Sequence, residues 1–215
     1  MASVPTGTAF YIASAFAASK PTASVSNAAE AVVGIVGHGY VDGDILEVSS
    51  GWGRLHLRPF RVKNATADTF KLEGCDTTNT QFFPPGTGVG SVRKVSAFTQ
   101  ITQVLGVSSS GGDPKTVDYK YIESDVNQSI NDGFSATSYQ LDIDADSIST
   151  PGYAALKSLT DVQTNTIMKM VVRSGAIVLQ GCTVALNEAP SVQDAQVMKV
   201  KASFNGTSKL VRYAS

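Results

Sequence analysis

Three aspartates that alternate along residues 142–146 form the strongest candidate for a metal site. Asp142, Asp144 and Asp146 occupy positions 1, 3 and 5 of a calcium loop of the EF-hand type. That loop requires glycine at position 6 and glutamate at position 12, where this chain has Ser147 and Tyr153. We therefore expect no metal here and interpret the three carboxylates as the polar face of a strand.

Other residues that support catalysis or cofactor binding are sparse. His38 and His56, the two histidines, have no further histidine or cysteine at zinc-ligand spacing. The sequence has no Gly-x-Ser-x-Gly nucleophile elbow, and the glycine run 86–90 lacks the G-x-G-x-x-G spacing of a nucleotide loop. Because no export signal precedes them, Cys75 and Cys182 are expected to be reduced. We expect no catalytic residue, metal or cofactor, and hence no enzyme.

The composition favours a protein whose surface is covered in its working state. Only 16% of the 215 residues are charged, and the net charge is −1, which gives no argument for nucleic-acid binding. Residues 96–146 hold eight acidic and two basic residues, whereas residues 147–215 hold three acidic and seven basic ones. Contact between these regions on neighbouring subunits is electrostatically favoured; two solvated faces are the alternative. No apolar run reaches ~18 residues, so no membrane insertion is expected.

The clearest structural pattern lies in residues 138–164. Apolar and polar residues alternate from Tyr139 to Asp146, which is typical of a half-buried strand. Thr150 and Pro151 then supply an N-cap and a first helical residue. The sequence predicts a helix over residues 151–164 with an apolar stripe of Ala155, Leu156, Leu159 and Val162.

Almost everything else in the chain predicts short strands, and therefore a mainly β fold. We expect strands at residues 8–16, 31–36, 45–48, 60–63, 69–72, 92–95, 97–104, 166–173, 176–179, 183–186, 197–204 and 209–213. Asn205-Gly206 predicts a tight turn between the last two of these strands.

Residues 21–95 predict a small β module of their own. The motif H-G-Y-x-x-G-D at residues 38–44, followed by T-x-x-T-F-x-L at residues 66–72, resembles small β modules that recur in tail proteins of phages. Trp52, between two glycines, is either a packed turn aromatic or a contact on the module exterior. The basic residues of this module, Arg54, Arg58, Arg61 and Lys63, are interpreted as a solvated face.

Residues 108–133 predict an extended arm, because a loop of this length inside a compact domain is usually functional. Its start at residues 108–112 is rich in glycine and serine and is expected to be flexible. Most of the acidic excess lies in this segment. The residues expected to make its contacts are Asp113, Lys115, Asp118, Tyr119, Tyr121, Glu123 and Asp125.

The order of these elements resembles the major tail tube proteins of phages with long, non-contractile tails. Three features carry the resemblance: a strand followed by the acidic arm (97–133), a strand–helix–strand unit (138–173), and a terminal hairpin at Asn205-Gly206. The resemblance covers roughly residues 1–20 and 96–215, with the module 21–95 as an insertion on the exterior. It implies an α+β fold that is mainly β, a sandwich or barrel with one flanking helix and a long arm.

The same resemblance implies a structural virion protein. Subunits would form rings, expected to be hexamers, that stack into a hollow tube through which phage DNA passes without specific binding. The arm would contact a neighbouring ring. Asp142, Asp144 and Asp146 would face either the lumen or the solvent, and in the lumen they would repel DNA phosphates. The implied partners are further copies of the chain and the tape measure, tail terminator and distal tail proteins, with assembly in the host cytoplasm.

Two other functions remain open from the sequence alone. A two-domain β binding module could attach to carbohydrate or to a cell surface through Trp52 and the Phe82-Phe83 loop. An enzyme that depends on His38 or His56 is the third alternative.

Overall fold

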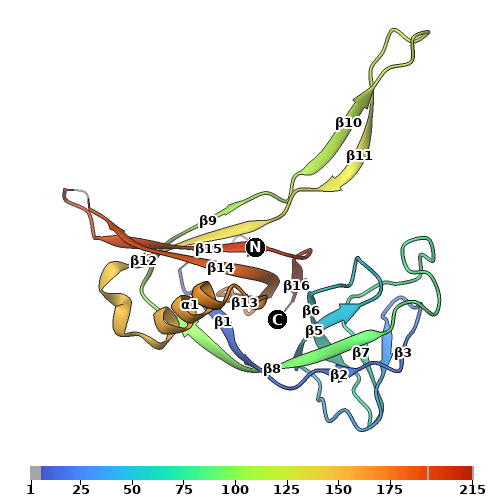
Figure 1. Cartoon of the computed structure of the whole chain (residues 1–215), viewed down its shortest axis with the longest axis horizontal. Coiled ribbons are helices and arrows are strands. Elements are labelled where there is room, and N and C mark those ends of the chain that lie inside the picture. Colours follow the sequence, from blue (N-terminus) through green and yellow to red (C-terminus); the bar gives the residue numbers. More distant parts are fainter. Residues whose placement is uncertain (1–5, 193, 215) are drawn as a thin grey trace.

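The computed structural model describes residues 6–192 and 194–214, which form a mainly β protein with one α-helix (Figure 1). In chain order the strands are β1 (Ala9–Phe16), β2 (Lys20–Pro21), β3 (Ser24–Val25), β4 (Val32–Gly34), β5 (Ile45–Ser50), β6 (Arg58–Lys63), β7 (Thr69–Leu72), β8 (Gly90–Ile101), β9 (Val104–Ser110), β10 (Pro114–Tyr119), β11 (Gln128–Phe134), β12 (Ser138–Asp144), β13 (Thr166–Val171), β14 (Ile177–Ser191), β15 (Lys199–Gly206) and β16 (Val211–Tyr213). The predicted fold class, mainly β with one flanking helix, is confirmed.

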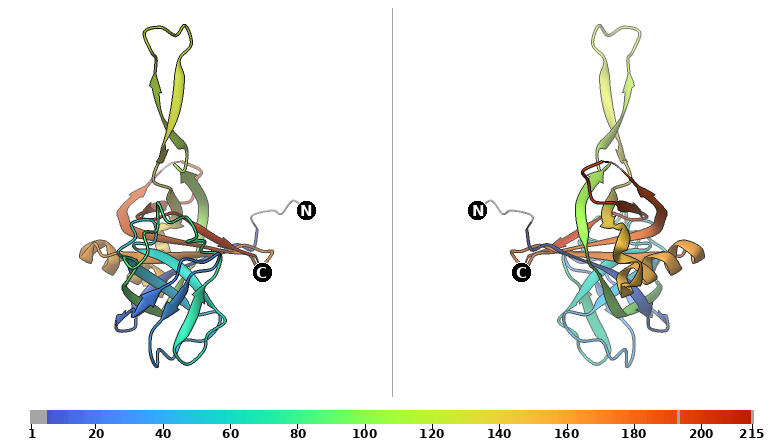
Figure 2. Two further views of the ribbon diagram at one scale, coloured as in Figure 1. Left: turned by 90° about the vertical axis from the view of Figure 1, so that its right-hand side faces the viewer. Right: turned by 90° about the vertical axis from the view of Figure 1, so that its left-hand side faces the viewer.

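Fourteen of the described strands form one sheet in the order β3-β4-β7-β6-β5-β8-β1-β13-β14-β15-β12-β9, in which β2 also pairs with β8 and β16 with β14. The remaining two, β10 and β11, pair only with each other. Their hairpin projects away from the rest of the molecule in every view (Figure 2). The sheet divides into a body (β1, β9 and β12–β15) and a module (β3–β7), and β8 takes part in both.

The body is organised around β12, where the predicted alternation is observed. Leu141 and Ile143 are fully buried, while Asp142 and Asp144, which alternate with them, stay partly exposed. A single apolar cluster joins these residues to β1, β13, β14 and β15, with Phe10, Met168 and Phe204 among its members. Burial of this face fixes the register of β12, since a slip by one residue would turn Leu141 and Ile143 to solvent.

Two consecutive helical segments follow β12. A 3₁₀ helix, η1 (Ala145–Ser149), was not predicted, and it removes Asp146 from the strand. The α-helix α1 (Pro151–Val162) begins as predicted, with the Thr150 side chain accepting a hydrogen bond from Tyr153 N. It ends two residues earlier than predicted, because Gln163 adopts a left-handed conformation.

The α1 helix packs against β14, β8 and β1. Its apolar stripe is shorter than the sequence predicted. Leu156 is fully buried and Ala155 and Leu159 are partly buried against the core, but Val162 in the last turn is 62% exposed.

The predicted terminal hairpin is wrong. Asn205 and Gly206 continue β15, where Asn205 pairs with Ser138 on one side and Thr183 on the other. The chain then leaves β15, and β16 pairs with the first residues of β14 instead. Gly206 is required for close packing, because an added Cβ would lie 2.1 Å from Gln180 Nε2.

Several predicted boundaries also differ from the structure. Strands 176–179 and 183–186 are one strand, β14, and strands 92–95 and 97–104 are replaced by β8 and β9. The turn between β8 and β9 places Gln103 in the left-handed region (φ 57°). The predicted flexible start of the arm is wrong for residues 108–110, since they lie in β9 and pair with β12.

The module has its own apolar core, separate from that of the body. Its members come from residues 31–92 and include Leu46, Trp52, Phe60 and Phe70. A third, smaller cluster lies at the seam between module and body, where Ile45 and Val95 meet Tyr213. The division into residues 21–95 and the remainder stays a prediction, and its boundary at residue 95 lies inside the continuous strand β8.

Candidate functional site

The arm is the most exposed part of the described chain. Cross-strand pairs such as Val117 with Ile130 and Tyr119 with Gln128 form a two-stranded ribbon. At the base, Ser135 N donates to the Asp113 carbonyl oxygen (2.9 Å) and closes the ribbon. The predicted arm residues all belong to this feature. Lys115, Asp118 and Tyr119 lie on β10, Asp113 precedes it, and Tyr121, Glu123 and Asp125 form the tip.

The ribbon carries apolar side chains without a core beneath them. Val117 and Ile130 share one face and are both more than half exposed, and Ile122 at the tip is fully exposed. The Tyr119 ring packs edge-on to Tyr121 with 5.4 Å between ring centroids. An isolated two-stranded hairpin is marginally stable in water. An exposed apolar face of this kind therefore indicates a surface that binds a partner.

The acidic row of residues 142–146 is divided among three local roles. Asp142 forms an ion pair with Lys199 on β15 (2.7 Å), and the hydrogen bond from Lys199 holds the pKa of Asp142 below its usual range. Asp144 caps η1 by accepting from Asp146 N (3.0 Å). Asp146 is exposed on η1. The predicted single polar strand face is therefore reduced to two residues, because the chain turns into η1 at Ala145.

Of the two interpretations of Trp52, the packed turn aromatic is the one observed and the exterior contact is wrong, because the ring is 2% exposed. Its indole N–H donates to the Pro84 carbonyl oxygen (2.9 Å) and to Thr87 Oγ1 (3.0 Å), and its ring packs edge-on to Phe83. Gly88 is needed here, since an added Cβ would lie 2.7 Å from the indole. The tryptophan therefore anchors the loop between β7 and β8, through Pro84 and Thr87, to the apolar core of the module.

The remaining chemical candidates are structural. His38 is buried; its Nδ1 accepts from Tyr40 N (2.9 Å), so Nε2 carries the proton that points to the Thr69 carbonyl oxygen. Within residues 6–192 and 194–214, no group of three or more possible metal ligands occurs. Both cysteines are free and buried. Burial raises the pKa of Cys75 to about 11 and that of Cys182 to about 12, so both stay thiols at neutral pH.

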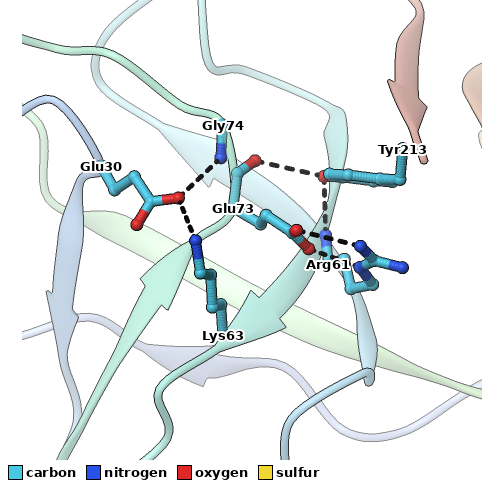
Figure 3. Close-up of polar contacts among 6 residues, drawn as sticks. All are labelled: Glu30, Arg61, Lys63, Glu73, Gly74 and Tyr213. Atoms are coloured by element: carbon cyan, nitrogen blue, oxygen red, sulfur yellow. Dashed lines mark hydrogen bonds and ion pairs between the residues drawn. The ribbon is translucent and has the colours of Figure 1, made fainter. Parts of the chain in front are cut away.

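A polar network at the seam was missed by the sequence analysis (Figure 3). Arg61 on β6 makes a bidentate contact with the Glu73 carboxylate, and Lys63 binds Glu30 (2.8 Å). The Tyr213 hydroxyl accepts from Arg61 N (2.9 Å) and donates to the Glu73 carbonyl oxygen (3.4 Å). The Arg61–Glu73 pair could have been anticipated from neighbouring strands, but nothing in the sequence indicates Tyr213.

One comparison with known proteins, the scan against family models, identifies a class for this chain. A family model described as phage tail tube protein, TTP, matches residues 50–215, which include the second half of the predicted module. A chain in a solved structure described as "Virion of native gene transfer agent (GTA) particle" is 12% identical, with a TM-score of 0.44 over 54% of this chain and 89% of that chain. No curated protein matches the chain. No described helix is both long and apolar enough to cross a membrane.

Proposed function

The chain belongs to the phage tail tube protein family, and from this premise we propose that it forms hexameric rings that stack into a hollow tube for phage DNA. As a member of this family it is a structural component of the virion tail and not an enzyme. The observation that carries the proposal is the arm, a ribbon whose apolar side chains are exposed in the isolated subunit. Stacking of rings would cover them.

The edge of the body sheet supports ring formation. Strand β9 is the last strand of the sheet path, and its Leu105 and Val107 side chains are about half exposed. A free edge with apolar side chains is a template for pairing with another chain. Pairing between neighbouring subunits would close the sheet around the ring and remove that edge.

The lumen is the second part of the proposal. Asp144 at the end of β12 and Asp146 on η1 would line the tube, while Asp142 is paired with Lys199. Acidic groups there would repel DNA phosphates, which is the inverse of the contacts that bind DNA. The module would lie on the exterior. Tape measure, tail terminator and distal tail proteins are the partners proposed for the lumen and the two tube ends.

Deletion of residues 111–132 tests the role of the arm. Ser110 and Ser138 are paired across β9 and β12, so residues 133–137 can close the shortened connection as a hairpin loop. The variant is expected to keep the circular dichroism and melting temperature of the parent body and to form no tubes in negative-stain images. Tubes of normal length from the deleted protein would contradict the proposal. Loss of the folded body would show instead that the arm belongs to the core.

A further inference from the structure

A cleft of about 540 Å³ lies at the base of the arm. The loop after β5 contributes Arg54, and β6 contributes Arg58 at its first position. The arm base contributes Phe134, and the loop after β15 contributes Ser208 and Lys209. Module, arm and body thus each supply one wall. The cleft is a place where the three parts of the subunit can bind one ligand together.

The basic side chains of this cleft lack acidic partners. No ion pair found among the described residues involves Arg54, Arg58 or Lys209. The acidic residue in the lining, Asp76, accepts instead from Thr78 N (2.9 Å) and Thr78 Oγ1 (2.7 Å). The lining therefore holds three cationic side chains and one carboxylate, and the cleft keeps an excess of positive charge.

Other arginines of the module do have carboxylate partners. Arg61 donates through two nitrogen atoms to the Glu73 carboxylate, and Arg93 does the same to the Glu47 carboxylate. Arg58, by contrast, keeps a buried Nε with no hydrogen-bond partner in the described part of the chain. A buried donor without a partner is costly. An acceptor that enters the cleft would remove that cost.

Two further features of the cleft fit an acidic peptide. The hydroxyl of Ser208 is also buried and has no partner within residues 6–192 and 194–214. Phe134 is 68% exposed, and Lys209 Nζ lies 5.8 Å from its ring centroid. The cleft thus combines cationic groups, a free hydroxyl and an exposed aromatic ring.

The tip of the arm, residues 120–127, has an acidic excess, with Glu123 and Asp125 against one basic residue, Lys120. Glu123 and Asp125 are exposed there, no ion pair among the described residues includes them, and the fully exposed Ile122 lies beside them. Charge and apolar surface therefore occur together at the tip, as they do in the cleft.

The tip cannot reach the cleft of its own subunit. β10 has 6 residues, which at ~3.3 Å per residue separate the tip from the arm base by about 20 Å. The tip of one copy can therefore meet only the cleft of another copy. Because tip and cleft lie at opposite ends of the same arm, the contact is head-to-tail, and its repetition extends a stack.

We propose that the cleft formed by Arg54, Arg58 and Lys209 is the docking site for the acidic arm tip of a second copy of this chain. The inference rests on the proposed function, in which the arm bridges neighbouring rings. It adds the receiving surface, and it gives the module a part in stacking. Glu123 and Asp125 of the arriving arm would pair with the cleft cations, and Ile122 would cover the Phe134 ring.

Charge exchange tests this contact. The cleft variant Arg54→Glu/Lys209→Glu and the arm variant Glu123→Lys/Asp125→Lys each place like charges against each other. Each is expected to raise the protein concentration needed for tubes about tenfold or more. The quadruple variant restores opposite charges and is expected to form tubes near the parent concentration. A quadruple variant no better than either double variant overturns the inference.

The control Lys71→Glu/Arg173→Glu makes the same charge change away from the cleft, and it is expected to form tubes as the parent does. Normal tubes from the cleft variant, combined with none from the arm deletion, would overturn the docking site and leave the proposed function intact. Normal tubes from the arm deletion would refute the proposed role of the arm itself. Retention on a DNA column is compared for the parent and the cleft variant. If the parent is retained, and the cleft variant is not retained but still forms normal tubes, the cleft binds nucleic acid and the docking inference is overturned. Melting temperatures of all variants check that each is folded.

Discussion

Replacing Tyr213 with phenylalanine removes one oxygen atom from the seam between module and body. The tyrosine is 6% exposed, and its hydroxyl bridges Arg61 N and the Glu73 carbonyl oxygen, next to the last paired residues of β6 and β7. In the variant neither backbone group has this partner, and an unsatisfied buried polar group costs about 1–3 kcal/mol. We expect Tyr213→Phe to lower the free energy of unfolding by about 2 kcal/mol.

Tyr40 provides a matched control for this change. It is 7% exposed, and its buried hydroxyl has no hydrogen-bond partner in residues 6–192 and 194–214. Removing that oxygen leaves no group unpaired, so Tyr40→Phe is expected to change the free energy of unfolding by less than about 0.5 kcal/mol. Urea unfolding followed by the fluorescence of Trp52, the single tryptophan, compares both variants with the parent. Equal stabilities of the two variants would refute the role assigned to the Tyr213 hydroxyl.

The raised pKa of Tyr213 predicts a loss of folding stability at high pH. Burial raises the pKa of Tyr213 to about 12, whereas an unfolded tyrosine titrates near ~10. The unfolded chain therefore releases this proton first, and the stabilisation present below pH ~10 declines as the pH rises through the folded pKa. The stability advantage of the parent over Tyr213→Phe is expected to shrink by about 2–3 kcal/mol between pH ~10 and ~12. An advantage that stays constant over this range would contradict the assignment.

Two further predictions concern the body. Leu156→Ala is expected to cost about 2–5 kcal/mol because the side chain is fully buried under α1, whereas Val162→Ala, at an exposed position of the same helix, should cost less than about 0.5 kcal/mol. Gly206→Ala is expected to cost about 3 kcal/mol, since its Cβ would lie 2.3 Å from the Thr137 carbonyl oxygen and closer still to Gln180. Thermal melting followed by circular dichroism measures both. Equal melting temperatures for the two helix variants, or an unchanged one for Gly206→Ala, would contradict the packing described.

The elements that the sequence predicts well are those whose local signals agree with their packing. β12 has a clean period of two with one buried face, and α1 has a side-chain cap followed by proline, so both appear where expected. The arm was predicted from its polar composition and length, and the structure adds that it is a paired ribbon.

The predictions failed where contacts distant in sequence decide the conformation. Asn205-Gly206 is a strong turn signal, yet pairing on both sides of β15 and the close approach of Gln180 hold it in a strand. For Trp52 the sequence left a packed and an exterior position open, and only the distant loop at Pro84–Thr87, which folds over the ring, decides for the packed one. The cleft at the arm base could not be predicted, since Arg54, Phe134 and Lys209 are brought together only by the fold.

A structure of tubes assembled from the purified chain, determined by cryo-electron microscopy, tests the central claim most directly. We predict hollow tubes of stacked hexameric rings, in which β9 pairs with a neighbouring subunit, Asp144 and Asp146 face the lumen, and each arm lies on the next ring. A protein that stays monomeric at high concentration, or that assembles into filaments without a lumen, would contradict it.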